Sequence, residues 1–152
     1  DWLRVGAEVR PDAPPIRVRF QNAASSLLST ASDYARFVAL ICERPRRAPW
    51  EISETMRRAM IAPQIAVQDG VPLSWGLGWG LEQSAPELRF AHEGNNDNLF
   101  TSYAIGDPAR GRGLVILTND GSGFGILQRI TRAATAFDPL SFLANLDPPR
   151  DA

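Results

Sequence analysis

Three segments in the second half of the chain have the composition of β-strands, at residues 88–92, 99–105 and 113–118. The last two are joined by a short stretch rich in glycine, proline and aspartate, and such a connection favours antiparallel pairing. The run Leu114 to Leu117 is apolar without interruption, which is typical of a strand that is covered on both faces. These strands restrict the fold to an antiparallel sheet with helices packed against it, an α/β fold of the α+β type. We expect two layers, with the last helix on one face of the sheet.

Helical patterns precede and follow this strand-rich region in the sequence. Thr30 can cap a helix through Asp33, and the chain stops following helical spacing at Arg44-Pro45. Ser53 can cap a shorter helix over 54–61 that ends before Pro63. A last helix is predicted over 126–137, closed by Asp138-Pro139, after a glycine turn in which Ser122 is a candidate cap. The expected apolar faces are Tyr34, Phe37, Val38 and Ile41 with buried Cys42; Met56, Ala59 and Met60; and Ile126, Leu127, Ile130, Ala133, Ala134 and Phe137.

A hairpin is predicted between the helices and the late strands. Asp69-Gly70 accepts the positive φ angles of a two-residue turn, with strands expected over 64–67 and 71–81. Gly76, Gly78 and Gly80 alternate within the second strand, where they would permit close backbone or aromatic packing.

Length and composition indicate one globular domain. The chain has 152 residues, of which 44% are hydrophobic, enough to bury a core. We expect an extended lead-in over 1–22, the domain proper over 23–137 and a tail over 138–152.

The charge pattern excludes several partners and mechanisms. The net charge of -1 is spread evenly, which gives no basic surface for nucleic acid, and no apolar stretch is long enough for a membrane segment. All 16 basic residues are arginine. Without lysine, the chain cannot supply a serine-lysine dyad, a Schiff base or a phosphate-binding lysine.

His92 is the only histidine and the strongest functional clue. It ends a strand-like segment that stops at Gly94 and opens into a polar loop over 95–98. Two interpretations stay open from spacing alone: a hydrogen-bonded structural histidine, or a residue of a reactive site. Because side chains alternate along a strand, Glu93 should point away from His92 and is a poor acid/base partner for it.

Other motifs fail on spacing. His92-Glu93 begins like the zinc pattern H-E-x-x-H, but residue 96 is asparagine, so no metal site is expected. The alternating glycines do not continue as a dinucleotide fingerprint, since residue 81 is leucine. Ser122 lacks the G-x-S-x-G surroundings of a nucleophile elbow. No cofactor is therefore expected.

The order of four segments resembles the C-terminal part of the serine beta-lactamase and penicillin-binding-protein-like family. The branch that they resemble holds class C beta-lactamases, D-alanyl-D-alanine carboxypeptidases and related esterases. Residues 29–37 resemble its "S-T-x-x-D-x-A-R-F" helix start, and 75–79 are similar to its "Y-G-L-G-W" strand. His92, Gly94 and Asn96 match an "H-x-G-x-N" form of its third active-site motif, and 113–119 match a "G-x-V-V-L-T-N" strand. The resemblance covers roughly residues 20–137.

The resemblance implies roles for four residues. His92 would occupy the K-T-G position and bind a substrate carboxylate or join the hydrogen-bond network around the nucleophile. Gly94 would let substrate approach the strand, and the backbone N–H of Asn95 would be one oxyanion-hole donor. Asn96 completes the motif in the active-site wall. The residues at 98 and 99 are Asn and Leu instead of the usual Gly-Phe, which leaves the shape of the following loop open.

The family's nucleophile lies in an S-x-x-K motif that precedes the segments seen here. We therefore expect a C-terminal fragment of a serine hydrolase that is inert alone, while the parent hydrolyses an ester, an amide or a beta-lactam in a small or peptide-like substrate. Its partner would be the N-terminal portion or a second copy. A signal sequence would lie upstream, with a periplasmic or secreted location if the parent is typical. The alternatives are a noncatalytic binding or association module, and a homologue whose parent has lost the nucleophile.

Overall fold

The computed structural model describes residues 3–5, 8–10, 23–24, 26–42, 52–84, 87–96 and 100–135. Within these ranges six strands form one antiparallel sheet in chain order, from β3 to β8. A separate two-stranded hairpin pairs β1 (Leu3–Val5) with β2 (Glu8–Arg10). The other elements are α1 (Ala31–Cys42), α2 (Glu54–Met60), β3 (Ile65–Ala66), β4 (Leu73–Trp75), β5 (Gly80–Ser84), β6 (Glu87–Asn96), β7 (Phe100–Asp107), β8 (Arg112–Thr118), the 3-10 turn η1 (Gly121–Gly123) and α3 (Phe124–Thr135).

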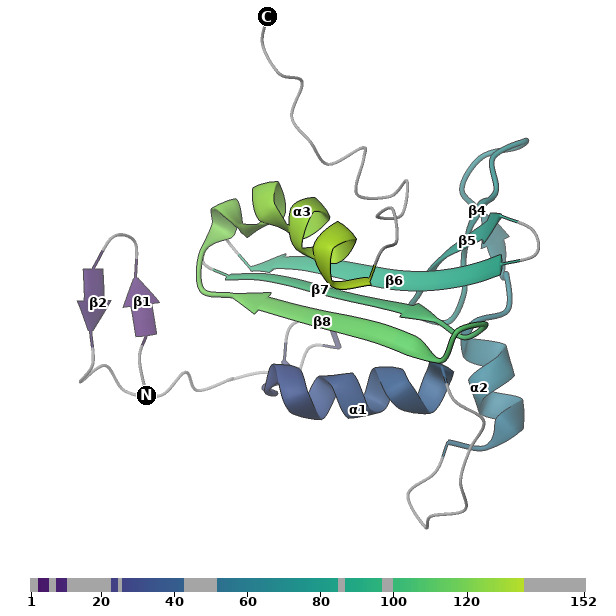
Figure 1. The fold of residues 1–152 in the computed structure, drawn as a ribbon, viewed down its shortest axis with the longest axis horizontal. Coiled ribbons are helices and arrows are strands. Elements are labelled where there is room, and N and C mark those ends of the chain that lie inside the picture. Colours follow the sequence, from purple (N-terminus) through teal and green to yellow (C-terminus); the bar gives the residue numbers. More distant parts are fainter. Residues whose placement is uncertain are drawn as a thin grey trace, which may run out of the picture.

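Helices cover both faces of the sheet, which confirms the predicted fold class. Helix α1 lies against one face and α3 against the other, as Figure 1 shows. Val115 packs in the core on the α1 side, whereas its neighbours Leu114 and Ile116 pack on the α3 side. The run at 114–117 is thus covered on both faces as predicted, but the expected two layers are wrong, because α1 adds a third. The domain boundaries at residues 22 and 137 stay a prediction.

Helix α1 starts as its sequence predicts. The Thr30 hydroxyl accepts a hydrogen bond from the Asp33 backbone N–H at 3.1 Å and donates one to the Asp33 carboxylate at 3.0 Å. This reciprocal pair satisfies a donor that a helix N-terminus would otherwise leave unpaired. Val38 and Ile41 are buried, and Cys42 occupies the buried position expected of it, with Sγ 3.2 Å from the carbonyl oxygen of Arg112.

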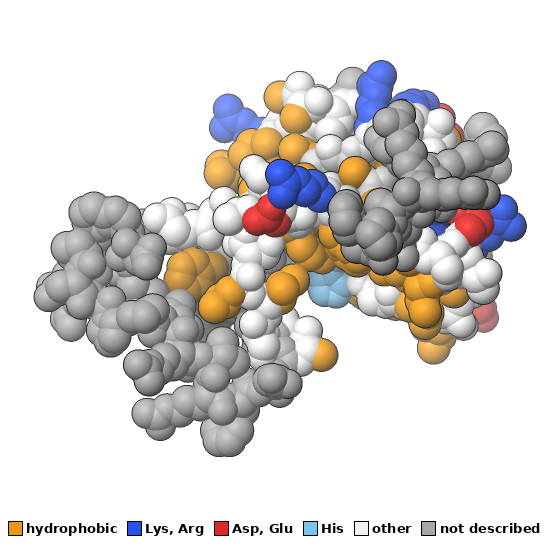
Figure 2. Space-filling view, turned by 90° about the horizontal axis from the view of Figure 1, so that it is seen from below, with side chains coloured by type: hydrophobic (Ala, Val, Ile, Leu, Met, Phe, Trp, Pro, Cys, Tyr) orange, Lys and Arg blue, Asp and Glu red, His pale blue; other side chains and the backbone are white. Residues whose placement is uncertain are grey.

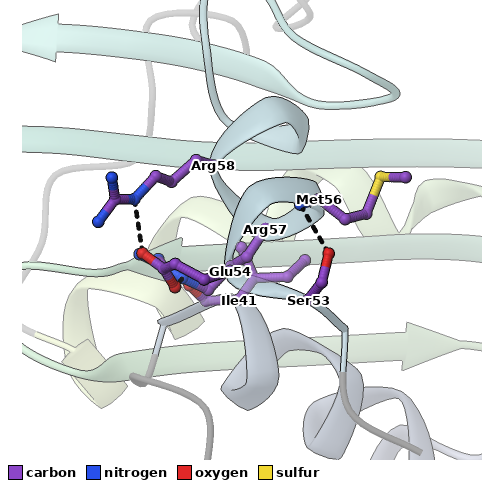
Figure 3. Close-up of polar contacts among 6 residues, drawn as sticks. All are labelled: Ile41, Ser53, Glu54, Met56, Arg57 and Arg58. Atoms are coloured by element: carbon purple, nitrogen blue, oxygen red, sulfur yellow. Dashed lines mark hydrogen bonds and ion pairs between the residues drawn. The ribbon is translucent and has the colours of Figure 1, made fainter.

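Helix α2 is attached to α1 by an arginine. Ser53 caps the helix as predicted, accepting a hydrogen bond from the Met56 N–H at 3.1 Å (Figure 3). Arg57 binds the Glu54 carboxylate through two nitrogens, at 2.8 and 2.9 Å, and donates to the Ile41 carbonyl at the end of α1 at 3.0 Å. Met56 is 51% exposed, so its predicted place on an apolar face is wrong: a helix this short buries only the side on which Met60 meets the core.

Stability should depend on pH through Glu54. Hydrogen bonds from Arg57 and Arg58 lower the pKa of the Glu54 carboxyl from 4.5 to about 2. A depressed folded-state pKa stabilises the fold above the unfolded value, and the contribution is lost as pH falls from about 4.5 towards 2. Urea unfolding across this window should show the midpoint falling, and Glu54→Gln should flatten part of that fall. The same slope in both proteins would contradict the assignment.

The predicted hairpin forms, but its second strand is broken. The turn at Asp69-Gly70 is present, with a φ of +76° at Gly70. Residues 71–81 are not one strand: β4 ends at Trp75, the chain turns, and β5 begins at Gly80. Gly78 has a φ of +78°, and the Gly76 backbone lies so close to the Met60 carbonyl that a Cβ would collide with it. Close packing at Gly76 is therefore confirmed, while the continuous strand is wrong.

Strand β6 runs further than its sequence predicts. It continues through Gly94 to Asn96, because β7 pairs with it up to Asn96↔Phe100. The predicted stop at Gly94 and the loop beginning at Asn95 are wrong, since cross-strand pairing outweighs the low strand preference of asparagine. His92 lies within the strand, opposite Ala104. Residues 97–99 of the predicted loop lie outside the described residues.

The last helix has a different cap and a different buried face from those expected. Asp120, not Ser122, caps the turn before it, accepting a hydrogen bond from the Ser122 N–H at 2.8 Å. Leu127 is buried as predicted. The other two buried residues of α3 are polar, Thr131 and Thr135. Ile126 and Ile130 are 45% and 37% exposed, so their predicted burial is wrong. The expected closure at 138–139 lies outside the described residues, among which no helix is long and apolar enough to span a membrane.

Candidate functional site

A groove of about 440 Å³ opens on the α1 face of the sheet. Viewed from that side, the single histidine lies among apolar side chains in Figure 2. The polar part of the lining is His92, Glu93 and Ser102, with Ser29 and Tyr34 nearby. The apolar part includes Leu27, Ala104, Val115 and Leu117. The groove therefore joins a polar strand segment to an apolar floor, as small-molecule sites commonly do.

Alternation along the strands explains which side chains share this face. His92 stands opposite Ala104, Gly94 opposite Ser102, and Ala104 opposite Val115. Directly opposed residues point to the same side of a sheet. Side chains from β6, β7 and β8 therefore lie on one surface, at positions set by the strand register.

His92 is exposed, and its ring is held from two sides. Nδ1 lies 2.6 Å from the backbone carbonyl oxygen of Glu93. The imidazole ring and the Trp75 ring make an edge-to-face contact, with centroids 5.8 Å apart and ring planes at 60°. Such edge-to-face contacts orient aromatic rings and contribute modest energy. The imidazole is therefore anchored at one nitrogen while the side chain remains accessible from the groove.

Strand β6 has a strand neighbour on only one side beyond Ala91. Pairing with β5 ends at Gly80↔Ala91, whereas pairing with β7 continues to Asn96. Among the described strands, none lies beside residues 92–96 on the β5 side. A strand edge of this kind is where an extended ligand can pair with backbone groups.

Gly94 keeps the surface beside this edge shallow. A Cβ at Gly94 would lie 2.6 Å from Oγ of Ser102 on the next strand. Any larger residue would have to displace that hydroxyl. The close approach to the strand that the sequence predicts for Gly94 is thus sterically possible here.

The structure brings together two of the four predicted site residues. His92 and Gly94 both line the groove. Asn95 follows in β6 with an exposed side chain, and Asn96 pairs by its backbone with Phe100. Asn95 is not among the residues that line the groove, and the side chain of Asn96 lies outside the described part of the chain. Their roles as oxyanion donor and motif residue stay predictions.

Sequence reasoning missed two residues of this site. Trp75 was significant only as part of a glycine-alternating segment, yet its ring meets His92. Ser102 gave no signal of its own, and only the register that sets it opposite Gly94 reveals it. Ser102 makes no hydrogen bond to His92 among the described contacts, so a serine-histidine pair is not assembled here.

The electrostatics of the groove are simple. Burial raises the pKa of the Tyr34 phenol, which keeps that hydroxyl protonated. Within the described ranges, no group of three or more His, Cys, Asp or Glu side chains is arranged to hold a metal ion. This surface can bind and orient a ligand by hydrogen bonds, but none of its described residues forms a nucleophile paired with a base.

Comparison with known proteins fits this geometry. The family model described as Beta-lactamase matches residues 2–137. No curated protein and no solved structure shows a significant match. The match spans most of the 152 residues, including the groove and all six strands of the sheet. The chain belongs to the beta-lactamase family.

Proposed function

We propose that this chain is the C-terminal portion of a serine hydrolase of the class C beta-lactamase, carboxypeptidase and esterase branch, forming one wall of its active site. One observation carries the proposal. The family match covers residues 2–137, yet no lysine occurs anywhere in the sequence. The serine-lysine pair that such chemistry needs must then come from another segment.

In the parent, a serine oxygen would attack the carbonyl carbon of an ester, amide or beta-lactam. The lysine of the S-x-x-K motif would take the proton of the serine hydroxyl; the bond to the leaving oxygen or nitrogen breaks, and that atom receives the proton. Water then attacks the acyl-serine and releases the acid. The N–H of Asn95 would stabilise the negative charge that develops on the carbonyl oxygen, an effect typically worth several kcal/mol, roughly 3 to 4. His92 and Gly94 would shape the wall beside it.

Two surfaces of the chain support association with an N-terminal portion. Strand β8 pairs with β7 alone among the described strands, so its other edge has no strand neighbour there. Leu117 on β8 is 47% exposed, and Ile126 and Ile130 on α3 are also exposed. Unpaired edges and exposed apolar side chains favour association with another segment. The open groove would receive the nucleophile-bearing part.

The test compares the chain alone with the longer polypeptide. The purified chain should not turn over a chromogenic beta-lactam or an aryl ester, and mass spectrometry should show no acyl adduct. A longer polypeptide that contains an upstream S-x-x-K should turn over at least one of them. Replacement of that serine by alanine is the matched control. Serine-dependent turnover by the chain alone would refute the proposal.

A noncatalytic association module is the second candidate, favoured by the same β8 edge. It predicts self-association without an upstream nucleophile motif, whereas the fragment proposal predicts complementation by the N-terminal portion. Light scattering of the purified chain, with and without that portion, separates them. The sequence immediately upstream also decides whether the parent has kept its nucleophile.

A further inference from the structure

The two ring nitrogens of His92 have different surroundings. Nδ1 lies 2.6 Å from the Glu93 carbonyl oxygen. A carbonyl oxygen only accepts hydrogen bonds, so Nδ1 must carry the proton. A neutral imidazole has one N–H, and Nε2 is then a hydrogen-bond acceptor. No second hydrogen bond of His92 occurs among the described residues.

Trp75 restricts the rotation that would break this arrangement. His92 is exposed, so little else on its own strand limits its side-chain torsions. The Trp75 ring lies 5.8 Å away at 60°. The backbone of Trp75 is fixed in turn, accepting a hydrogen bond from the Gln64 N–H at 2.8 Å and pairing with Gly80. The contact comes from a well-anchored strand end.

We propose that Trp75 is a positioning residue that holds His92 as its Nδ1–H tautomer, so that neutral His92 offers Nε2 to a hydrogen-bond donor in the groove. The nature of that donor rests on the proposed function: a hydroxyl of the reacting network suits the acceptor, whereas a substrate carboxylate does not. The groove lining supports this choice. It contains no arginine among the described residues, so this wall supplies no permanent cation for a carboxylate. Substrates with an uncharged acyl group are favoured at this wall.

Because His92 is the only histidine, the tautomer can be read directly. Protein labelled with ¹⁵N only in histidine gives one pair of ring nitrogens, and long-range ¹H–¹⁵N correlation spectra show which of them is protonated. The measurement is made where these spectra show the imidazole to be neutral. The wild-type chain should show the Nδ1–H pattern. A predominant Nε2–H pattern would overturn the proposal.

Two substitutions test the part played by Trp75. Trp75→Ala should lower the ratio of the Nδ1–H to the Nε2–H form about fivefold, the size expected when a hydrogen bond worth on the order of 1 kcal/mol is lost. Trp75→Phe keeps an aromatic edge and should retain most of the wild-type ratio. Leu77→Ala, an exposed position in the same turn, is the matched control.

Equal ratios in wild type and a folded Trp75→Ala variant would refute the positioning role. If Trp75→Ala does not fold, the Trp75→Phe variant decides instead: a ratio as low as that of free histidine would contradict the proposal. These spectra do not depend on catalytic activity. The tautomer can therefore be established even if the proposed hydrolase activity fails, and the two failures are distinguishable.

Discussion

His92→Ala in the longer hydrolase should lower kcat/KM about 100-fold, the lower end of what a positioned proton-transfer or hydrogen-bonding side chain contributes. The reason is local. Nε2 is the only ring nitrogen left to interact with the reacting groups, since Nδ1 binds the Glu93 carbonyl. The fold should survive, because His92 is exposed and its loss opens no core cavity. Steady-state kinetics together with urea unfolding measure both effects.

Conservative variants sharpen this prediction. His92→Gln can offer an amide oxygen near the position of Nε2, whereas the shorter amide of His92→Asn imitates the Nδ1 side. The glutamine variant should therefore keep more activity than the asparagine variant. Leu77→Ala, in the turn beside Trp75, should leave kcat/KM unchanged. Wild-type activity in the His92→Ala enzyme would remove His92 from the site.

Phe90→Ala should destabilise the chain by about 3 to 5 kcal/mol, the usual cost of removing a buried phenylalanine. Phe90 is fully buried, and its ring meets Trp79 edge to face with centroids 4.8 Å apart. On the neighbouring strand it fills the space over Gly106, where a Cβ would collide with the ring. Urea unfolding followed by tryptophan fluorescence gives the loss.

The size of the replacement provides the control. Phe90→Leu keeps most of the apolar volume and should cost no more than about 1.5 kcal/mol. Leu77→Ala should remain within about 0.5 kcal/mol of wild type. Since domains are typically stable by only about 5 to 15 kcal/mol, Phe90→Ala should unfold at low denaturant. A loss below that of Phe90→Leu would contradict the packing described for β6 and β7.

Much of the fold could be predicted from contacts between residues that are close in sequence. Thr30 and Ser53 cap helices because a side-chain hydroxyl and a nearby N–H are close in sequence, and such contacts can be read from spacing. The limits of β6 could not be read in this way. Pairing with β7 extends it to Asn96, and that stabilisation comes from a different strand.

The site was less predictable than the fold. Alternation along a strand can be read from the sequence, and it puts residues 92 and 94 on one face. His92 and Gly94 both line the groove. The contact between Trp75 and His92 depends on where β5 begins and on the turn that precedes it. No periodicity contains that information. Likewise, the buried threonines of α3 show that a helix can turn a partly polar stripe towards a sheet.

The rate at which Cys42 reacts with a thiol reagent measures how often the end of α1 separates from the sheet. Cys42 is 5% exposed at the end of α1, and its Sγ lies near the Arg112 carbonyl at the start of β8. It is the only thiol in the sequence. A thiol reagent can therefore reach the chain at this one position only when the helix end separates from the strand. The labelling rate reports how often the end of α1 separates from the sheet, without any engineered probe.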